Sequence, residues 1–128
     1  MQFVKQRLDM RKQNYIRALS LLEKQASRND FEDENIAATL HFYEMAFELA
    51  WKLLKDFLEI EGFVVKSPRE VIKTAYSTEY IKDGFLWIEM LGARNTVAHM
   101  YDENIARQLF VKIKSEYIQP LAKLRDLV

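Results

Sequence analysis

The segment from Arg94 to Tyr101 contains residue types that can carry out phosphodiester chemistry without a metal. An arginine such as Arg94 can bind a phosphate through two parallel N–H bonds and offset charge that grows on its oxygens. Histidine titrates near neutral pH, so His99 can take a proton from a ribose 2′-hydroxyl or give one to the leaving oxygen. Tyr101 can orient the reacting group or accept a transferred nucleotide, and Asn95 can position the phosphate. Arg94 and His99 are therefore the candidate catalytic residues, and Asn95 and Tyr101 the candidate substrate-binding residues.

The spacing of these residues requires a helix end between them. Arg94 and His99 are five residues apart, which separates them by about 140° on a regular helix. They converge only if the helix ends near Ala98 and the chain turns back, and Asp102 as the next cap indicates such an end. The alternative is structural: Arg94 pairs with a carboxylate of the fold, while His99 and Tyr101 only close a turn.

The composition predicts a single all-α domain that spans residues 1–128. Only three Gly and two Pro occur in 128 residues, which leaves too few turn residues for a fold built from many strands. The absence of Cys excludes disulfides and thiolate metal sites and is typical of a reducing compartment. The first residues are charged, and no apolar run approaches the roughly 18 residues of a membrane span. We therefore expect a cytoplasmic protein with no membrane contact.

Apolar residues at steps of three and four predict four long helices and one short one. The first two cover about residues 3–26 and 35–61, the second of them ended by Gly62. A capping box at 67–70 opens the short helix, and Asp83 and Asp102 can cap the last two. Pro120 should kink or end the last helix. Short connections then favour an antiparallel up-and-down four-helix bundle with one extra short helix.

The periodicity also predicts the buried faces of the last two helices. For the helix after Asp83, the expected core residues are Phe85, Ile88 or Trp87, Leu91 and Ala98. For the helix after Asp102, they are Ile105, Leu109, Ile113, Tyr117, Leu121 and Leu124.

The formal net charge is zero, but the charges are unevenly distributed along the chain. Residues 1–30 and those after Arg107 are mainly basic, whereas residues 31–61 are mainly acidic. The outer helices could hold RNA phosphates nonspecifically, although such charges usually only solvate outer helix faces. The basic residues concerned are Arg7, Arg11, Lys12, Lys112 and Lys114.

Two other kinds of site receive little support. His41, Glu44 and Glu48 share one flank of the second helix, but their order is opposite to the Glu-x-x-His of di-iron bundles. A solvated acidic flank, which could also receive a partner protein, is the favoured interpretation. The three glycines lie singly, so the chain has no glycine-rich phosphate loop, and a partner would have to activate any nucleotide.

Arg94-Asn95-x-x-x-His99-x-Tyr101 resembles the R-x4-H-x-Y signature of the HEPN superfamily. Within it, the chain is similar to the nucleotidyltransferase substrate-binding proteins, the HepT-type toxins. Further elements of this resemblance occur in the family's order across about residues 5–125: Glu48 to Lys52, Gly62, Ser67 to Arg69, Ala75 and Trp87.

The resemblance implies a homodimeric helical bundle in which two copies of the segment face one cleft. It implies a metal-independent ribonuclease that needs Arg94 and His99 and no organic cofactor, with RNA as substrate. It also implies a small nucleotidyltransferase partner that acts as antitoxin by adenylylating Tyr101. The dimer has separate support, because a second copy supplies a second His99 as acid or base. Trp87 and Met90 could form the dimer contact or belong to the core.

Three hypotheses follow from these observations. The favoured one is an endoribonuclease toxin of a toxin–antitoxin pair, in which Arg94 polarises the scissile phosphate and His99 transfers protons. The second is a noncatalytic subunit that binds a substrate for its nucleotidyltransferase. The third is purely structural, with the segment only locking a helix end.

Overall fold

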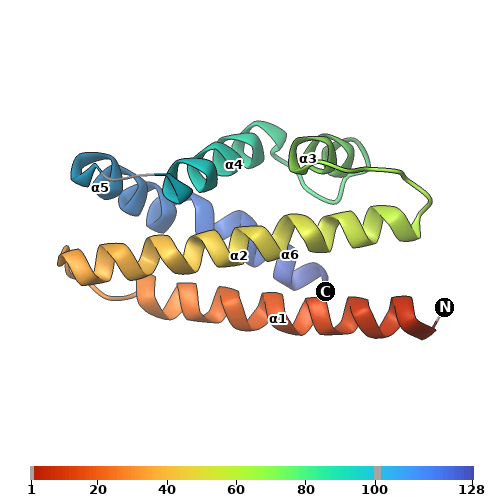
Figure 1. Cartoon of the computed structure of the whole chain (residues 1–128), viewed down its shortest axis with the longest axis horizontal. Helices are drawn as coiled ribbons and strands as arrows, with labels where there is room; N and C mark the ends of the chain where they lie inside the picture. Colours follow the sequence, from red (N-terminus) through yellow and green to blue (C-terminus); the bar gives the residue numbers. More distant parts are fainter. Residues whose placement is uncertain (1, 100–101) are drawn as a thin grey trace.

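The computed structural model describes residues 2–99 and 102–128, and these residues form a bundle of helices without strands (Figure 1). The predicted all-α fold is therefore confirmed. The elements in chain order are α1 (Gln2–Ala26), α2 (Asp33–Ile60), α3 (Pro68–Ser77), α4 (Gly84–Ala98), α5 (Glu103–Lys112), η1 (Ile113–Tyr117) and α6 (Ile118–Leu127). No helix in this described part of the chain is long and apolar enough to cross a membrane.

The long helix α2 is the centre of the bundle. Figure 1 shows α1 alongside it, and α3, α4 and α5 over its opposite side. The predicted stripe of apolar residues on α2 is buried: Ile36, Leu40, Tyr43, Phe47, Ala50, Leu54 and Leu58 are each at most 5% exposed. The helix ends before Gly62, whose φ of 96° is the left-handed conformation that glycine adopts without strain.

The shorter helices begin at the predicted caps. The Ser67 hydroxyl accepts a hydrogen bond from the Glu70 N–H at 3.2 Å, and Pro68 occupies the first turn of α3. The Asp83 carboxylate accepts from the Leu86 N–H at 3.0 Å, which satisfies one of the free N–H groups that begin α4. Capping thus determines where the helix that carries Arg94 starts.

Replacing Asp83 by alanine is expected to lower the free energy of unfolding by about 1 kcal/mol, because α4 loses its side-chain cap. Urea denaturation of the wild type and the variant measures this difference. Asp83→Asn is the control, since asparagine caps as well as aspartate and should retain the wild-type value. Equal losses in both variants would show that the charge, and not the cap, stabilises α4.

The predicted core face of α4 is only partly correct. Trp87 and Leu91 are buried as expected, but Phe85 is 92% exposed and Ala98 is also exposed. The prediction was wrong for these two because α4 is apolar on several sides, so the pattern does not define one face. Met90 is fully buried, so both Trp87 and Met90 belong to the core and are not available for a dimer contact.

The last predicted helix is continuous through Pro120 but contains the π-helical segment η1. The Ile118 N–H bonds the Ile113 carbonyl, five residues back, and the wide turn precedes the proline that cannot donate its own bond. Pro120 therefore lies inside α6 and does not end it. Of the predicted inward residues of this helix, Ile105 is 40% exposed, whereas Ile113 and Tyr117 are buried.

Candidate functional site

The candidate site lies at the C-terminal end of α4. The helix ends at Ala98, and His99 is its C-cap with φ −126° and ψ 17°. The His99 N–H bonds the Thr96 carbonyl at 3.1 Å, which tightens the last turn. Asp102 caps α5 by accepting from the N–H groups of Asn104 and Ile105. The predicted helix end between Arg94 and Asp102 is therefore confirmed.

Buried contacts hold α4 against α2. The Tyr43 hydroxyl donates to the Met90 carbonyl at 2.7 Å, and the rings of Phe47 and Trp87 lie 5.8 Å apart. Both contacts are in the core, where a displaced side chain leaves a void or an unpaired polar group. The position of α4, and hence of the residues at its end, is fixed by this packing.

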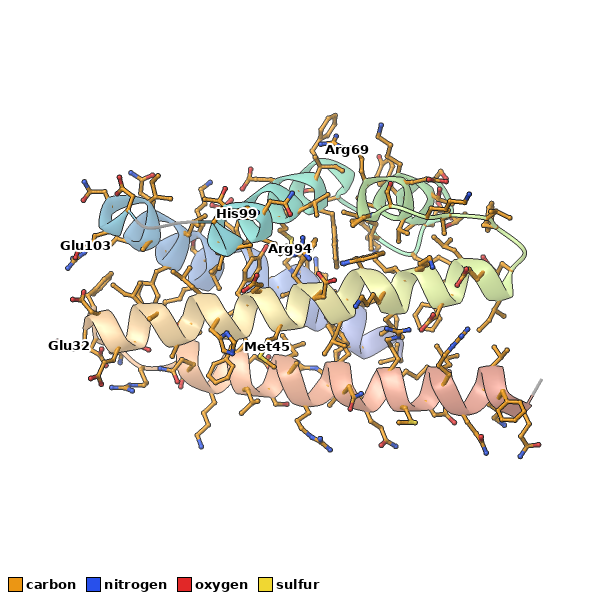
Figure 2. The ribbon with its side chains drawn as sticks, viewed as in Figure 1. Glu32, Met45, Arg69, Arg94, His99 and Glu103 are labelled. Atoms are coloured by element: carbon orange, nitrogen blue, oxygen red, sulfur yellow. The ribbon has the colours of Figure 1, made fainter. Side chains whose placement is uncertain are left out.

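Arg94 extends from α4 to α2 and forms an ion pair with Glu48 (Figure 2). One terminal nitrogen of its guanidinium, Nη2, donates to Glu48 Oε2, and the other, Nη1, donates to Asn95 Oδ1 at 2.9 Å. The Lys52 ammonium lies 3.5 Å from Glu48 Oε1. The expectation that Arg94 could pair with a carboxylate of the fold is met, but its side chain still has 27% of its surface exposed.

His99 and Asn95 are exposed to solvent. The His99 imidazole forms no hydrogen bond with another described residue, and none joins it to Arg94. The structure thus places Arg94, Asn95 and His99 in the last turns of one helix without a direct contact between Arg94 and His99. Tyr101 lies outside the described residues, so its predicted role has no structural counterpart here.

The expected basic face of the outer helices is largely engaged in contacts within the bundle. Arg11 bonds the buried Asp56 at 2.8 Å, and Lys112 bonds Glu116 at 2.9 Å. The Lys114 ammonium donates to a backbone carbonyl at 3.1 Å. Arg11 and Lys112 are thus paired with carboxylates, so the basic face is a weaker phosphate-binding surface than the sequence indicated.

The residues of the acidic flank of α2, His41, Glu44 and Glu48, differ in their exposure to solvent. His41 is exposed, whereas Glu48 is partly buried against Arg94. Over residues 2–99 and 102–128, no group of three or more His, Asp or Glu side chains is arranged to hold a metal ion. Glu48 is therefore part of the surroundings of Arg94 and not simply a solvated residue.

Two buried tyrosines behind the site remain protonated at neutral pH. Burial raises the pKa of Tyr43 well above its usual value, and the nearby Tyr117 and Glu89 raise it further. Burial also raises the pKa of Tyr117, and so does its hydrogen bond to Glu89 at 2.7 Å. Both hydroxyls therefore act as hydrogen-bond donors that join helices.

Sequence analysis did not identify Glu48 and Lys52 as neighbours of Arg94. Their spacing of four residues on α2 predicts an ion pair between them, and the structure has that pair. Which residue of α4 faces them depends on how the two helices pack, and a local pattern does not contain this information.

Comparison with known proteins identifies relatives of the chain. The family described as "Nucleotidyltransferase substrate binding protein like" matches residues 10–127. A crystal structure of a protein from Thermus thermophilus is similar, with 28% sequence identity and a TM-score of 0.81, over 88% of this chain and 97% of that one. No curated protein matches the chain.

Proposed function

The chain belongs to the nucleotidyltransferase substrate binding protein like family, and on this premise we propose that it works together with a nucleotidyltransferase. We further propose that it is a HEPN-type, metal-independent endoribonuclease, the toxin of a toxin–antitoxin pair. Arg94 and His99 are its catalytic residues, Asn95 and Tyr101 contact the RNA, and no metal or organic cofactor takes part.

The observation that carries this proposal is the contrast between Arg94 and His99. Arg94 is half-buried and held by Glu48 and Asn95, so its orientation is set before substrate binds. His99 is exposed in the cap of the same helix and has no described hydrogen-bond partner. A fixed cation and an exposed imidazole toward the end of the same helix are suitable groups for binding a phosphate and moving a proton.

The proposed reaction is attack of a ribose 2′-oxygen on the adjacent phosphorus. One His99 removes the proton of the 2′-hydroxyl, and the bond from phosphorus to the 5′-oxygen breaks as the new bond forms. The leaving 5′-oxygen receives a proton, so the products are a 2′,3′-cyclic phosphate and a 5′-hydroxyl. Arg94 offsets the negative charge that develops on the phosphate oxygens.

We propose a homodimer because this reaction uses both a general base and a general acid. Each chain contributes one His99, and two copies facing one cleft would contribute one residue for each role. The outer side of α4 carries the 92% exposed Phe85 together with the half-buried Ile88. Contact with a second copy would remove these apolar side chains from water.

The proposed partner regulates the enzyme by modifying Tyr101. The tyrosine oxygen attacks the α-phosphorus of ATP, pyrophosphate leaves, and the hydroxyl proton is released to solvent. The product is an adenylylated tyrosine two residues from His99. The added nucleotide would fill the space that an RNA substrate needs. Its negative phosphate would also compete with the RNA phosphate for Arg94.

The family description favours a second candidate function. As a noncatalytic subunit, the chain would bind a substrate and present it to the nucleotidyltransferase, with Arg94 as the docking cation. The Arg94–Glu48 pair is compatible with this role, because an ion-paired arginine can hold an anion without any proton transfer.

The test is incubation of the purified protein with a mixed RNA pool in the presence of EDTA. The nuclease proposal predicts cleavage that leaves cyclic-phosphate ends. Light scattering on the same sample should give the mass of a dimer. A folded protein that binds a nucleotidyltransferase but leaves the RNA intact would exclude the nuclease and support the substrate-binding subunit.

A further inference from the structure

The packing of α4 on α2 brings two charged residues of α2 to the candidate site. We propose that Glu48 and Lys52 belong to the phosphate-binding site, Glu48 as a positioning residue for Arg94 and Lys52 as a second cation. This inference rests on the proposed function, because it assigns RNA as the ligand of the Arg94 guanidinium. It adds two residues from another helix to a site that sequence analysis confined to residues 94–101.

The Arg94 guanidinium has hydrogen-bond donors that the fold leaves available. A guanidinium has five N–H donors, and Glu48 and Asn95 each take one, from Nη2 and Nη1. The Nε donor is buried and has no partner among the described residues. Each terminal nitrogen therefore keeps one further N–H that can donate to an anion.

The ion pair with Glu48 also restricts the conformational freedom of the Arg94 side chain. A free arginine side chain has many rotamers, and ordering them on binding costs free energy that lowers affinity. Glu48 and Arg94 are both only partly exposed, at 29% and 27% of their side-chain surfaces, so their ion pair is shielded from much of the solvent. Glu48 thus orders the Arg94 side chain in advance.

Lys52 determines the sign of the local charge around Arg94. An isolated Arg94–Glu48 pair would have no net charge and would attract a phosphate only weakly. Lys52, whose ammonium is 3.5 Å from the second oxygen of Glu48, makes the net charge of the three side chains +1. That charge matches the single negative charge of one phosphodiester group.

A nearby ion pair shows what a purely structural role would look like. Lys55 and Glu59, about two turns further along α2, lie 3.7 Å apart with the same spacing of four residues. Among the described residues, neither has a contact with α4 of the kind that Glu48 has with Arg94. Such exposed pairs contribute little to stability and provide a matched comparison for Lys52 and Glu48.

The effect of Glu48→Gln on RNA binding distinguishes positioning from simple electrostatics. Removal of a negative charge beside a phosphate site should strengthen binding if only the charge matters. If Glu48 orients Arg94, affinity should instead fall by about tenfold, the magnitude typical of residues that orient a ligand-binding side chain. Glu48→Asp keeps the charge but shortens the side chain, so positioning predicts a loss for this variant too.

The assay is fluorescence anisotropy of a short RNA with 2′-O-methyl groups, which binds but has no free 2′-hydroxyl for cleavage. Lys52→Gln should weaken binding and reduce the dependence of log affinity on log salt concentration by about 0.7, one phosphate contact to a single strand. Glu44→Gln and Lys55→Gln are the charge-matched controls and should bind like the wild type. Circular dichroism checks that each variant is folded.

The outcomes separate this inference from the proposed nuclease. Weaker binding by the Glu48 and Lys52 variants supports the inference, whether or not wild-type protein cleaves unmodified RNA. Tighter binding by Glu48→Gln, or values equal to those of the controls, would overturn it even if cleavage is observed. Absence of RNA binding by the wild type would overturn it together with the nuclease.

Discussion

Replacement of His99 by alanine is expected to lower the rate of RNA cleavage by about 10²–10⁴-fold, the usual contribution of a general acid or base. The folded structure should be retained, because the imidazole is exposed and has no described hydrogen-bond partner. The cap interaction involves the backbone N–H of residue 99, which alanine also possesses. Cleavage by the wild type and the variant, measured in EDTA with equal concentrations of folded protein, gives the ratio.

The second half of this experiment is Arg94→Lys, which keeps the positive charge but loses the planar pair of donors. Cleavage should fall by about 10²–10³-fold, as when a donor that stabilises a transition state is removed. His41→Ala is the control, since this exposed histidine lies on α2 and should have no effect. Undiminished cleavage in both the His99 and the Arg94 variants would refute the proposed active site.

The elements of the fold that depend on local sequence could be predicted. The apolar stripe of α2 follows one face along most of the helix, and Gly62 supplies the left-handed residue that ends it. Serine or aspartate caps α3, α4 and α5 through hydrogen bonds from N–H groups within three residues, and Pro68 occupies the first turn of α3. Such interactions involve only residues close together in the chain, so they can be predicted from the sequence alone.

The rotation of α4 about its axis could not be predicted. Phe85, Trp87, Ile88 and Leu91 are all apolar, so several faces of this helix could be buried. Packing against α2 distinguishes them, since the Tyr43 hydroxyl donates to the Met90 carbonyl and the Phe47 ring lies 5.8 Å from the Trp87 ring. The resulting orientation buries Trp87 and leaves Phe85 in solvent.

The candidate site, like the fold, could be predicted from the sequence only in part. That Arg94 and His99 lie on either side of a helix end follows from their spacing and from Asp102, and the structure has this arrangement. The partner of Arg94 is 46 residues away in the chain and depends on the rotation of α4. Sequence spacing could therefore locate the candidate segment but not Glu48, with which its arginine forms an ion pair.

Tyr101→Phe is expected to abolish the proposed control by a nucleotidyltransferase, because phenylalanine has no hydroxyl to accept an adenylyl group. With the nucleotidyltransferase and ATP present, wild-type protein should gain the mass of one adenylyl group and lose its cleavage activity. The variant should gain no mass and continue to cleave RNA. Mass spectrometry of the intact protein and the RNA assay, performed on one sample, measure both effects.

Tyr76→Phe is the matched control for this experiment, because Tyr76 is 53% exposed and lies on a different helix, α3. It should be modified and silenced like the wild type. Loss of modification in the Tyr76 variant instead would move the acceptor to α3. A Tyr101 variant that is silenced without any gain in mass would mean that the partner blocks the site by binding alone. The hydroxyl of Tyr101 would then be dispensable, and regulation would depend on the surface around Arg94 and His99.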